Sequence, residues 1–414
     1  MKALKESAFA RLWTAAFFSE TAEWMLQVAL PVFIYRMTGS AASTAASVVL
    51  GLLPAVLLSP VAGVLADRWN RRLVLCVVCA GQAVVAVPLF LVTGAGSVPL
   101  VYLVMAAQAG LASLFEPARN ALIPELVPAG ELTGANGMMS VNSSVARLAG
   151  GWVGGLLLGA GGLGWVVTAY LATLVVAAAI LAMPFARVQA PVAAGGHEPM
   201  VRAWIDGLAE IKRSRPLRVT GAMLVLMSLA QGMFLVLFVL FVLNTLNGSE
   251  ADVGLLRGVQ AIGGLLAGLS VATIARKVPA AKLLGWGTLV LGVVSALIWD
   301  SAFLTTALPV YVGLFMVVGA PGVAGGAGLL SVIQAATPPE RAGRVLSTGF
   351  AGMALFNAVG ALAAGVLVVP LGLTGTLNIQ AALHVCAGLI VLIGLVWGHG
   401  KSVREPELAA AGPV

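Results

Sequence analysis

Long apolar segments alternate with short polar ones along the whole of this chain. Each apolar segment holds about 20 residues or more, enough at ~1.5 Å rise per residue to cross roughly 30 Å of hydrocarbon as a helix. The pattern predicts twelve membrane-spanning helices, over residues 12–36, 43–66, 73–95, 98–118, 134–160, 163–185, 217–244, 253–275, 283–299, 303–332, 345–369 and 374–398.

The composition supports a membrane protein. Hydrophobic residues make up 60% of the chain and charged residues 9%, and the mean hydropathy is +1.02. This is too little polar surface to cover a soluble globule of 414 residues. The stretch before Arg11 is short and mildly basic, and the apolar run after it is too long for a signal-peptide core, so the first helix is expected to stay in the protein.

The basic residues indicate the orientation of the helices. All but three of the 23 Lys and Arg fall on one side if the N-terminus is cytoplasmic. The exceptions are Arg36 and Arg257 on the outer side and Arg147 within a helix. Because Lys and Arg are retained in cytoplasmic loops, both termini are predicted to be cytoplasmic. The pI near 9.7 then reflects membrane topology rather than nucleic-acid binding.

The longest polar interruption divides the predicted helices into six and six. We expect an N-terminal bundle at 1–186, a cytoplasmic linker at 187–216, a C-terminal bundle at 217–398 and a cytoplasmic tail at 399–414. Within the linker, apolar residues at helical spacing indicate a short amphipathic helix on the membrane surface, although a linker solvated by its charges is the alternative. These residues are Trp204, Ile205, Leu208 and Ile211.

Two carboxylates lie in the first predicted helix, where ionisable groups are costly and usually functional. Glu20, Glu23 and Gln27 share one stripe at spacings of three and four. Counted along their helices, Glu23 lies about 18 Å deep and Arg147 about 20 Å deep. Arg147 also lies on a polar stripe, with Asn136, Ser140 and Ser143.

These depths suggest a site for a proton near the middle of the membrane. We hypothesise that Glu23 is the proton-responsive carboxylate, that Arg147 stabilises its charged form, and that Glu20 is the second choice. A static ion pair that joins two helices is the alternative.

Enzymatic chemistry has no basis in the sequence. There is no phosphate-binding G-x-x-x-x-G-K-[ST] loop, and the three histidines have no metal-ligand spacing. Cys76, Cys79 and Cys386 all fall inside predicted helices, where they are expected to fill space. We therefore expect neither a metal nor a cofactor, and coupling to an ion gradient is what remains.

The most specific motif is the charge cluster Gly63–Arg72, between the second and third helices. It resembles the G-x-L-A-D-R-x-G-R-R signature of the major facilitator superfamily and departs from it where Asn70 replaces glycine. The resemblance implies two six-helix bundles related by a pseudo-two-fold axis, with a substrate cavity between them that opens to each side in turn.

The resemblance also implies a role for the cluster itself. Asp67 would tie the second helix to the eleventh as a conformational latch, with Gly63 allowing close approach and Arg68, Arg71 and Arg72 beside it. The alternative is that the arginines only anchor a loop on the cytoplasmic side.

Two further segments resemble family features. Gly150, Gly151, Gly154 and Gly155 match the G-P-x-x-G-G core found in proton-linked exporters, except that Gly151 replaces proline; simple close packing is the alternative. Phe115–Arg119 resembles a segment at the end of the fourth helix, and Glu116 with Arg119 is expected to form a gate or a structural helix end. By family analogy the cavity candidates, each of which is otherwise a core residue, are Gln27, Gln108, Gln231, Met233, Phe234, Tyr311 and Met316.

Sparse polar groups among Met and aromatic side chains suit a large, partly apolar ligand. Short segments such as Leu12-Trp13 and Ile123–Leu126 resemble bacterial exporters of the macrolide, multidrug and siderophore type. The predicted function is proton-coupled efflux of amphipathic molecules such as drugs by a monomer in the bacterial plasma membrane, without a nucleic-acid partner. The alternatives are a lysophospholipid flippase of the same fold and a non-transporting scaffold or sensor.

Overall fold

The computed structural model describes residues 6–68, 70–183, 208–273, 278–337 and 339–397. Within these ranges it describes all side chains except those of residues 55, 56, 59–68, 129, 133, 269–273, 339, 340, 342 and 343. The described residues are nearly all helical, and they contain no strand. The prediction of an all-α chain is confirmed for this part of the protein.

Ten long helices account for most of the described chain. They are α1 (Ser7–Thr38), α2 (Ala41–Arg68), α3 (Arg71–Ala86), α4 (Val98–Leu126), α5 (Leu132–Ala182), α7 (Arg215–Leu240), α8 (Glu250–Thr273), α9 (Ala280–Asp300), α10 (Leu308–Ala336) and α11 (Pro339–Val391). Short 3₁₀ turns cover Val87–Leu91, Ala95–Ser97, Ala129–Glu131 and Ser301–Phe303, and π-helical turns cover Phe241–Thr245 and Leu392–Trp397. Residues 208–213 form a short helix, and the rest of the predicted linker helix lies outside the described residues.

Seven helical segments of the described chain are long and apolar enough to cross a membrane. Two of them, at 134–182 and 344–397, contain 49 and 54 residues, which is more than twice what one crossing requires. Each is interrupted by a glycine with non-helical angles: Gly162 (φ 73°, ψ −170°) in α5 and Gly372 (φ 70°, ψ 170°) in α11. The chain changes direction at these two residues.

Replacing Gly162 by alanine is expected to destabilise the protein by about 1–3 kcal/mol, because this backbone region is open almost only to glycine. Gly164→Ala is the matched control: its Cβ would meet open space, and the change should be at most about 1 kcal/mol and stabilising. Denaturant unfolding of the detergent-solubilised protein measures both. Equal losses in the two variants would contradict the explanation.

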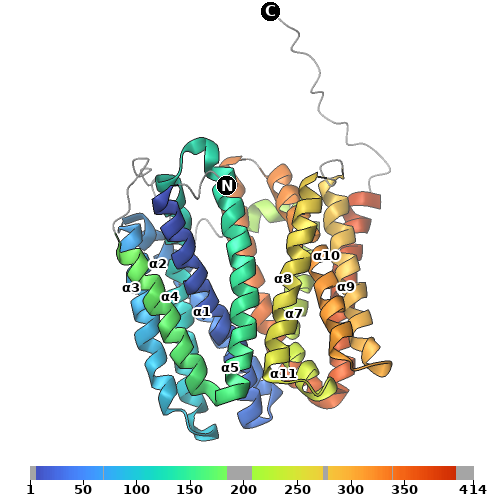
Figure 1. Ribbon diagram of the computed structural model, residues 1–414. Coiled ribbons are helices and arrows are strands. Elements are labelled where there is room, and N and C mark those ends of the chain that lie inside the picture. The colour runs from blue at the N-terminus through green and yellow to red at the C-terminus, as the bar shows by residue number, and fades with distance from the viewer. Residues whose placement is uncertain (1–5, 69, 184–207, 274–277, 338, 398–414) are drawn as a thin grey trace, which may run out of the picture.

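The helices form two groups, α1–α5 and α7–α11, which stand beside each other in Figure 1. In the first group α1 packs mainly on α5, and in the second α7 packs mainly on α11. The principal contacts between the groups are α5 with α8 and α2 with α11. We refer to the face where α1 begins at Ser7 as the N-terminal face and to the face where α1 ends at Gly39 as the far face.

Candidate functional site

The polar stripe of α1 runs from a buried to an exposed position: Glu20 is buried, Glu23 is half-buried and Gln27 is exposed. Glu20 is 8% exposed, and one turn further Glu23 accepts a hydrogen bond from Gln27 Nε2 at 2.9 Å. Glu23 and Gln27 line two neighbouring cavities. We call these the charged cavity, of about 300 Å³, and the large cavity, of about 710 Å³.

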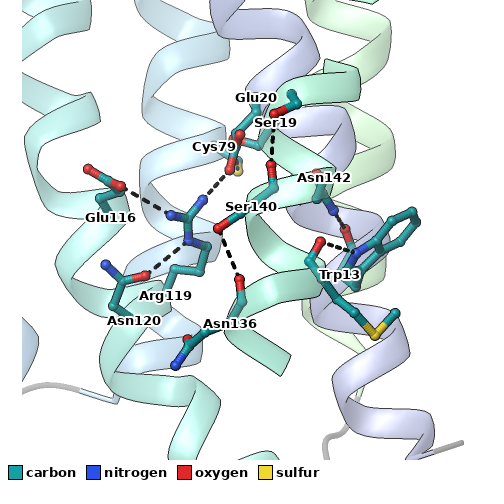
Figure 2. A network of polar contacts seen from close by, with 12 residues as sticks. Trp13, Ser19, Glu20, Cys79, Glu116, Arg119, Asn120, Asn136, Ser140 and Asn142 are labelled. Atoms are coloured by element: carbon teal, nitrogen blue, oxygen red, sulfur yellow. Dashed lines mark hydrogen bonds and ion pairs between the residues drawn. The ribbon is translucent and has the colours of Figure 1, made fainter. Parts of the chain in front are cut away.

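Arg119 of α4 is the partner of Glu20. The two side chains form a buried ion pair, and Arg119 also reaches Glu116 at 3.2 Å and Asn120 at 3.4 Å, as Figure 2 shows. The side chains of Arg119 and Glu20 are only 8% and 11% exposed, whereas that of Glu116 is 73% exposed. Glu116 and Arg119 therefore do lie together, but the main partner of Arg119 is the buried Glu20 carboxylate of α1.

Arg147 of α5 lines the charged cavity together with Glu20, Glu23 and Glu116. Among the described residues it makes no ion pair with Glu23. Its guanidinium instead lies 5.7 Å from the ring centre of Trp24, and its Nε is buried without a hydrogen-bond partner. The structure thus brings Glu23 and Arg147 to one cavity but leaves the expected pair unformed, with Glu23 bonded to Gln27 and Arg147 over Trp24.

Arg257 of α8 is a site residue that the sequence analysis missed. It lines a third cavity of about 140 Å³, which we call the seam cavity, together with Trp24 and Gln27 of α1 and Phe238 of α7. Its guanidinium lies 5.0 Å from the ring centre of Phe234. The sequence analysis used Arg257 only in the charge count, as a residue on the outer side of the membrane, whereas in the structure α8 turns it toward the other group of helices.

Of the predicted cavity residues, Gln27 lines all three cavities and Gln108 lines the large one. Gln108 already donates to the Gln82 carbonyl oxygen at 2.7 Å and accepts from the Tyr170 hydroxyl at 2.9 Å. Tyr311 is a core residue rather than a cavity residue: it is fully buried beside Phe241, and its hydroxyl donates to Thr305 O at 3.0 Å.

The remaining cavity candidates belong to the second group of helices. Phe234 faces Arg257 through its ring, and it is 9% exposed. Like Phe234, the others are absent from the lining of the three cavities, and they are Gln231, Met233 and Met316.

The predicted latch is described only in part, since the side chains of Gly63, Asp67 and Arg68 lie outside the described residues. Arg71 forms an ion pair with the buried Glu125 of α4 and donates to Ala121 O at 3.0 Å. Arg72 donates to Ala182 O of α5 at 3.1 Å. Both arginines therefore fasten the start of α3 to helices of its own group.

Asn70, the departure from the signature, is the N-cap of α3. Its side-chain oxygen accepts from the backbone N–H groups of Arg72 at 3.2 Å and Leu73 at 3.4 Å. An asparagine here satisfies two donors that the first helical turn leaves without partners, which a glycine cannot do.

The four glycines of α5 pack on two different helices. A Cβ on Gly154 would lie 2.7 Å from Met25 O, and one on Gly150 would lie 2.9 Å from the Trp24 Cβ, so this pair faces α1. Gly151 and Gly155 face α8 instead, against Gly254 and Glu250. The stripe therefore allows α5 to pack closely on both groups.

Polar contacts also join the two groups at the far face. Arg36 Nε at the end of α1 lies 2.9 Å from Glu250 Oε1 at the start of α8. Nearby, Asn244 Nδ2 donates to the Tyr35 hydroxyl at 2.5 Å. These bonds lie at the far face, whereas Gly150 and Gly151 make their contacts beside the charged and seam cavities.

Comparison with known proteins places this arrangement in a wider context. The family model described as "Transmembrane secretion effector" matches residues 1–411. The multidrug efflux pump Tap of Mycobacterium tuberculosis is 30% identical, over 92% of this chain and 90% of that protein. Macrolide efflux protein A of Streptococcus pyogenes is 23% identical, over 92% of this chain and 94% of that protein.

Solved structures show the same fold at low identity. A bacterial homologue of the iron transporter ferroportin, in an inward-facing state, superposes with a TM-score of 0.73 at 14% identity, over 94% of this chain and 98% of the other. A D-xylose–proton symporter superposes with a TM-score of 0.70 at 17% identity, over 95% and 98%.

Proposed function

Since this chain belongs to the transmembrane secretion effectors of the major facilitator superfamily, we propose that it exports amphipathic small molecules in exchange for protons. The observation that carries the proposal is a cavity system with buried carboxylates and arginines, enclosed by two groups of apolar helices. The relatives named as multidrug and macrolide efflux pumps support the direction of transport.

We propose that the chain crosses the membrane twelve times. α5 and α11 each supply two crossings, divided at Gly162 and Gly372. The two groups of helices are then six-helix bundles, joined by the linker at 187–216. With both termini in the cytoplasm of a bacterium, the N-terminal face is cytoplasmic. The cavities then lie on the cytoplasmic side of the Arg36–Glu250 and Tyr35–Asn244 contacts, as in an inward-facing transporter.

The proton site of this proposal is Glu23. Its carboxylate is held by the neutral Gln27 and lines both the charged and the large cavity. Glu20 is already neutralised by Arg119 within its own bundle. A carboxylate without a cationic partner gains and loses a proton more readily than one fixed in a buried ion pair, so Glu23 is the better carrier.

The lining of the large cavity suits an amphipathic substrate. Leu26, Leu30, Leu52 and Met105 contribute apolar surface, and polar groups are few. Gln108 adds little hydrogen-bonding capacity for a substrate, because its amide nitrogen and its amide oxygen each already make a hydrogen bond within the protein. A sugar would need many more hydrogen-bonding partners than this lining offers. The protein is proposed to act as a monomer, with the proton gradient as its only energy source.

Transport by purified protein in liposomes tests this function. We expect an imposed pH gradient to drive accumulation of a lipophilic cation or a macrolide, and the ligand to drive proton movement in return. A protonophore should abolish both fluxes. Absence of proton flux with a broad ligand panel would contradict the proposal, and translocation of a fluorescent lysophospholipid without proton flux would favour the flippase.

A further inference from the structure

Two arginines of the cavity system lack a carboxylate partner. By contrast, Arg36, Arg71, Arg119 and Arg341 each form an ion pair with a carboxylate. Arg147 and Arg257 lie over aromatic rings instead, those of Trp24 and Phe234. A charge at membrane depth without a counter-charge is costly, and residues that bear this cost usually bind something.

The two arginines flank the same turn of α1. Trp24 and Gln27 line both the charged cavity, which holds Arg147, and the seam cavity, which holds Arg257. Arg147 belongs to the first group of helices and Arg257 to the second. A ligand beside this turn would therefore meet guanidinium groups from both halves of the protein.

Their geometry leaves hydrogen-bond donors unused. A guanidinium that contacts an aromatic ring through its face keeps the N–H groups along its edge available. The buried Arg147 Nε has no acceptor, and Arg257 has no ion-pair partner within the described chain. Planar donors of this kind match the two oxygens of a carboxylate.

We infer that the preferred substrates carry an acidic group, and that Arg257, assisted by Arg147, binds it beside Trp24. This inference rests on the proposed transport function and narrows its substrate class. The Glu23 carboxylate also lines the large cavity, which neither arginine lines, and there it suits a basic group on the same molecule. The preferred substrate is therefore a zwitterionic amphipath whose apolar body lies against the aromatic rings.

A matched pair of dyes tests the acidic group directly. A rhodamine with a free carboxyl group is zwitterionic, and its methyl ester keeps the cation and the ring system but lacks the acid. Fluorescence anisotropy measures their binding to the full-length protein in lipid nanodiscs without a pH gradient. We expect the acid to bind about 10- to 100-fold more tightly than the ester, as for a hydrogen-bonded charge pair.

Variants assign that preference to Arg257. In Arg257→Gln the acid and the ester should bind equally, with the affinity for the ester unchanged, and Arg257→Lys should keep part of the preference because it keeps the charge. Arg218→Gln is the control, since Arg218 is an exposed arginine of α7 bonded only to Lys212 O at 2.7 Å. Size-exclusion profiles and melting temperatures show that each variant is folded.

Equal affinities in the unaltered protein would overturn the inference, as would a preference that persists in folded Arg257→Gln or a lack of binding by either dye. The proposed export function fails in a different way, through absence of gradient-driven flux in liposomes while the binding preference remains intact.

Discussion

Replacing Glu23 by glutamine is expected to abolish transport driven by a pH gradient in a protein that still folds. Glutamine has almost the same shape and can still accept a hydrogen bond from Gln27, which lies 2.9 Å away. It cannot take up or release a proton, so exchange against a proton has no carrier. Uptake into inverted vesicles under an imposed pH gradient measures the loss, and a size-exclusion profile shows that the variant is folded.

The control for this substitution is Glu131→Gln. Glu131 lies in the turn between α4 and α5, away from the residues that line the three cavities, and its neutralisation should leave gradient-driven uptake intact. Undiminished uptake by the Glu23 variant would remove this residue from the mechanism. A parallel loss in Glu20→Gln alone would transfer the role to Glu20.

Truncation of Arg119 to alanine should cause the largest loss of stability, about 3–5 kcal/mol, because it leaves the Glu20 carboxylate buried without its counter-charge. The variant in which Glu20→Gln and Arg119→Gln are combined should recover much of that loss, since no uncompensated charge remains. Reversible unfolding in mixed micelles, followed by intrinsic fluorescence, gives the free energy of unfolding for each protein.

Glu116→Gln tests the exposed ion pair of Arg119 with Glu116 apart from the buried ion pair of Arg119 with Glu20. Its side chain is 73% exposed and lies 3.2 Å from the same guanidinium, so its removal should cost only about 0–1 kcal/mol. Similar losses for Arg119→Ala and Glu116→Gln would show that the Glu20–Arg119 pair contributes little to stability.

The apolar pattern was sufficient to predict where the helices lie along the chain. The predicted break between residues 160 and 163 contains Gly162, and the break between 369 and 374 contains Gly372. Both turns require a backbone conformation that glycine permits, and both fall where the apolar segment is too long for one crossing.

The rotation of each helix, which decides the charge pairs, could not be predicted in the same way. The fourth helix was expected to end at 118, near Pro117 and the charge of Arg119, but α4 continues to Leu126. A proline and a basic residue commonly mark a helix end, and here packing overrides that signal. Arg119 was therefore assigned to a gate at the cytoplasmic end, and Glu20 was left without its true partner.

Depth along a helix was also a poor guide to neighbours. Glu23 and Arg147 were expected to pair because their depths agree, but depth does not show in which direction each side chain points. Glu23 accepts a hydrogen bond from Gln27, one turn away on the same helix, and Arg147 lies over the ring of Trp24. In α8, Gly254 and Gly258 mark the face that packs on α5, and Arg257 lies beside them. That pattern was the available signal for Arg257.

The double-sided glycine stripe of α5 has a mechanical consequence. Gly150 rests on Trp24, which borders two of the cavities, and the next residue along, Gly151, rests on Gly254 of the opposite bundle. Because the glycines have no side chain, α5 packs directly on α1 and on α8, and no side chain can change its rotamer to accommodate a movement of one helix. If the protein works as proposed, we expect a substrate that displaces Trp24 to displace α5 as well, so that substrate binding is coupled to the contact between α5 and α8 through a single turn of helix.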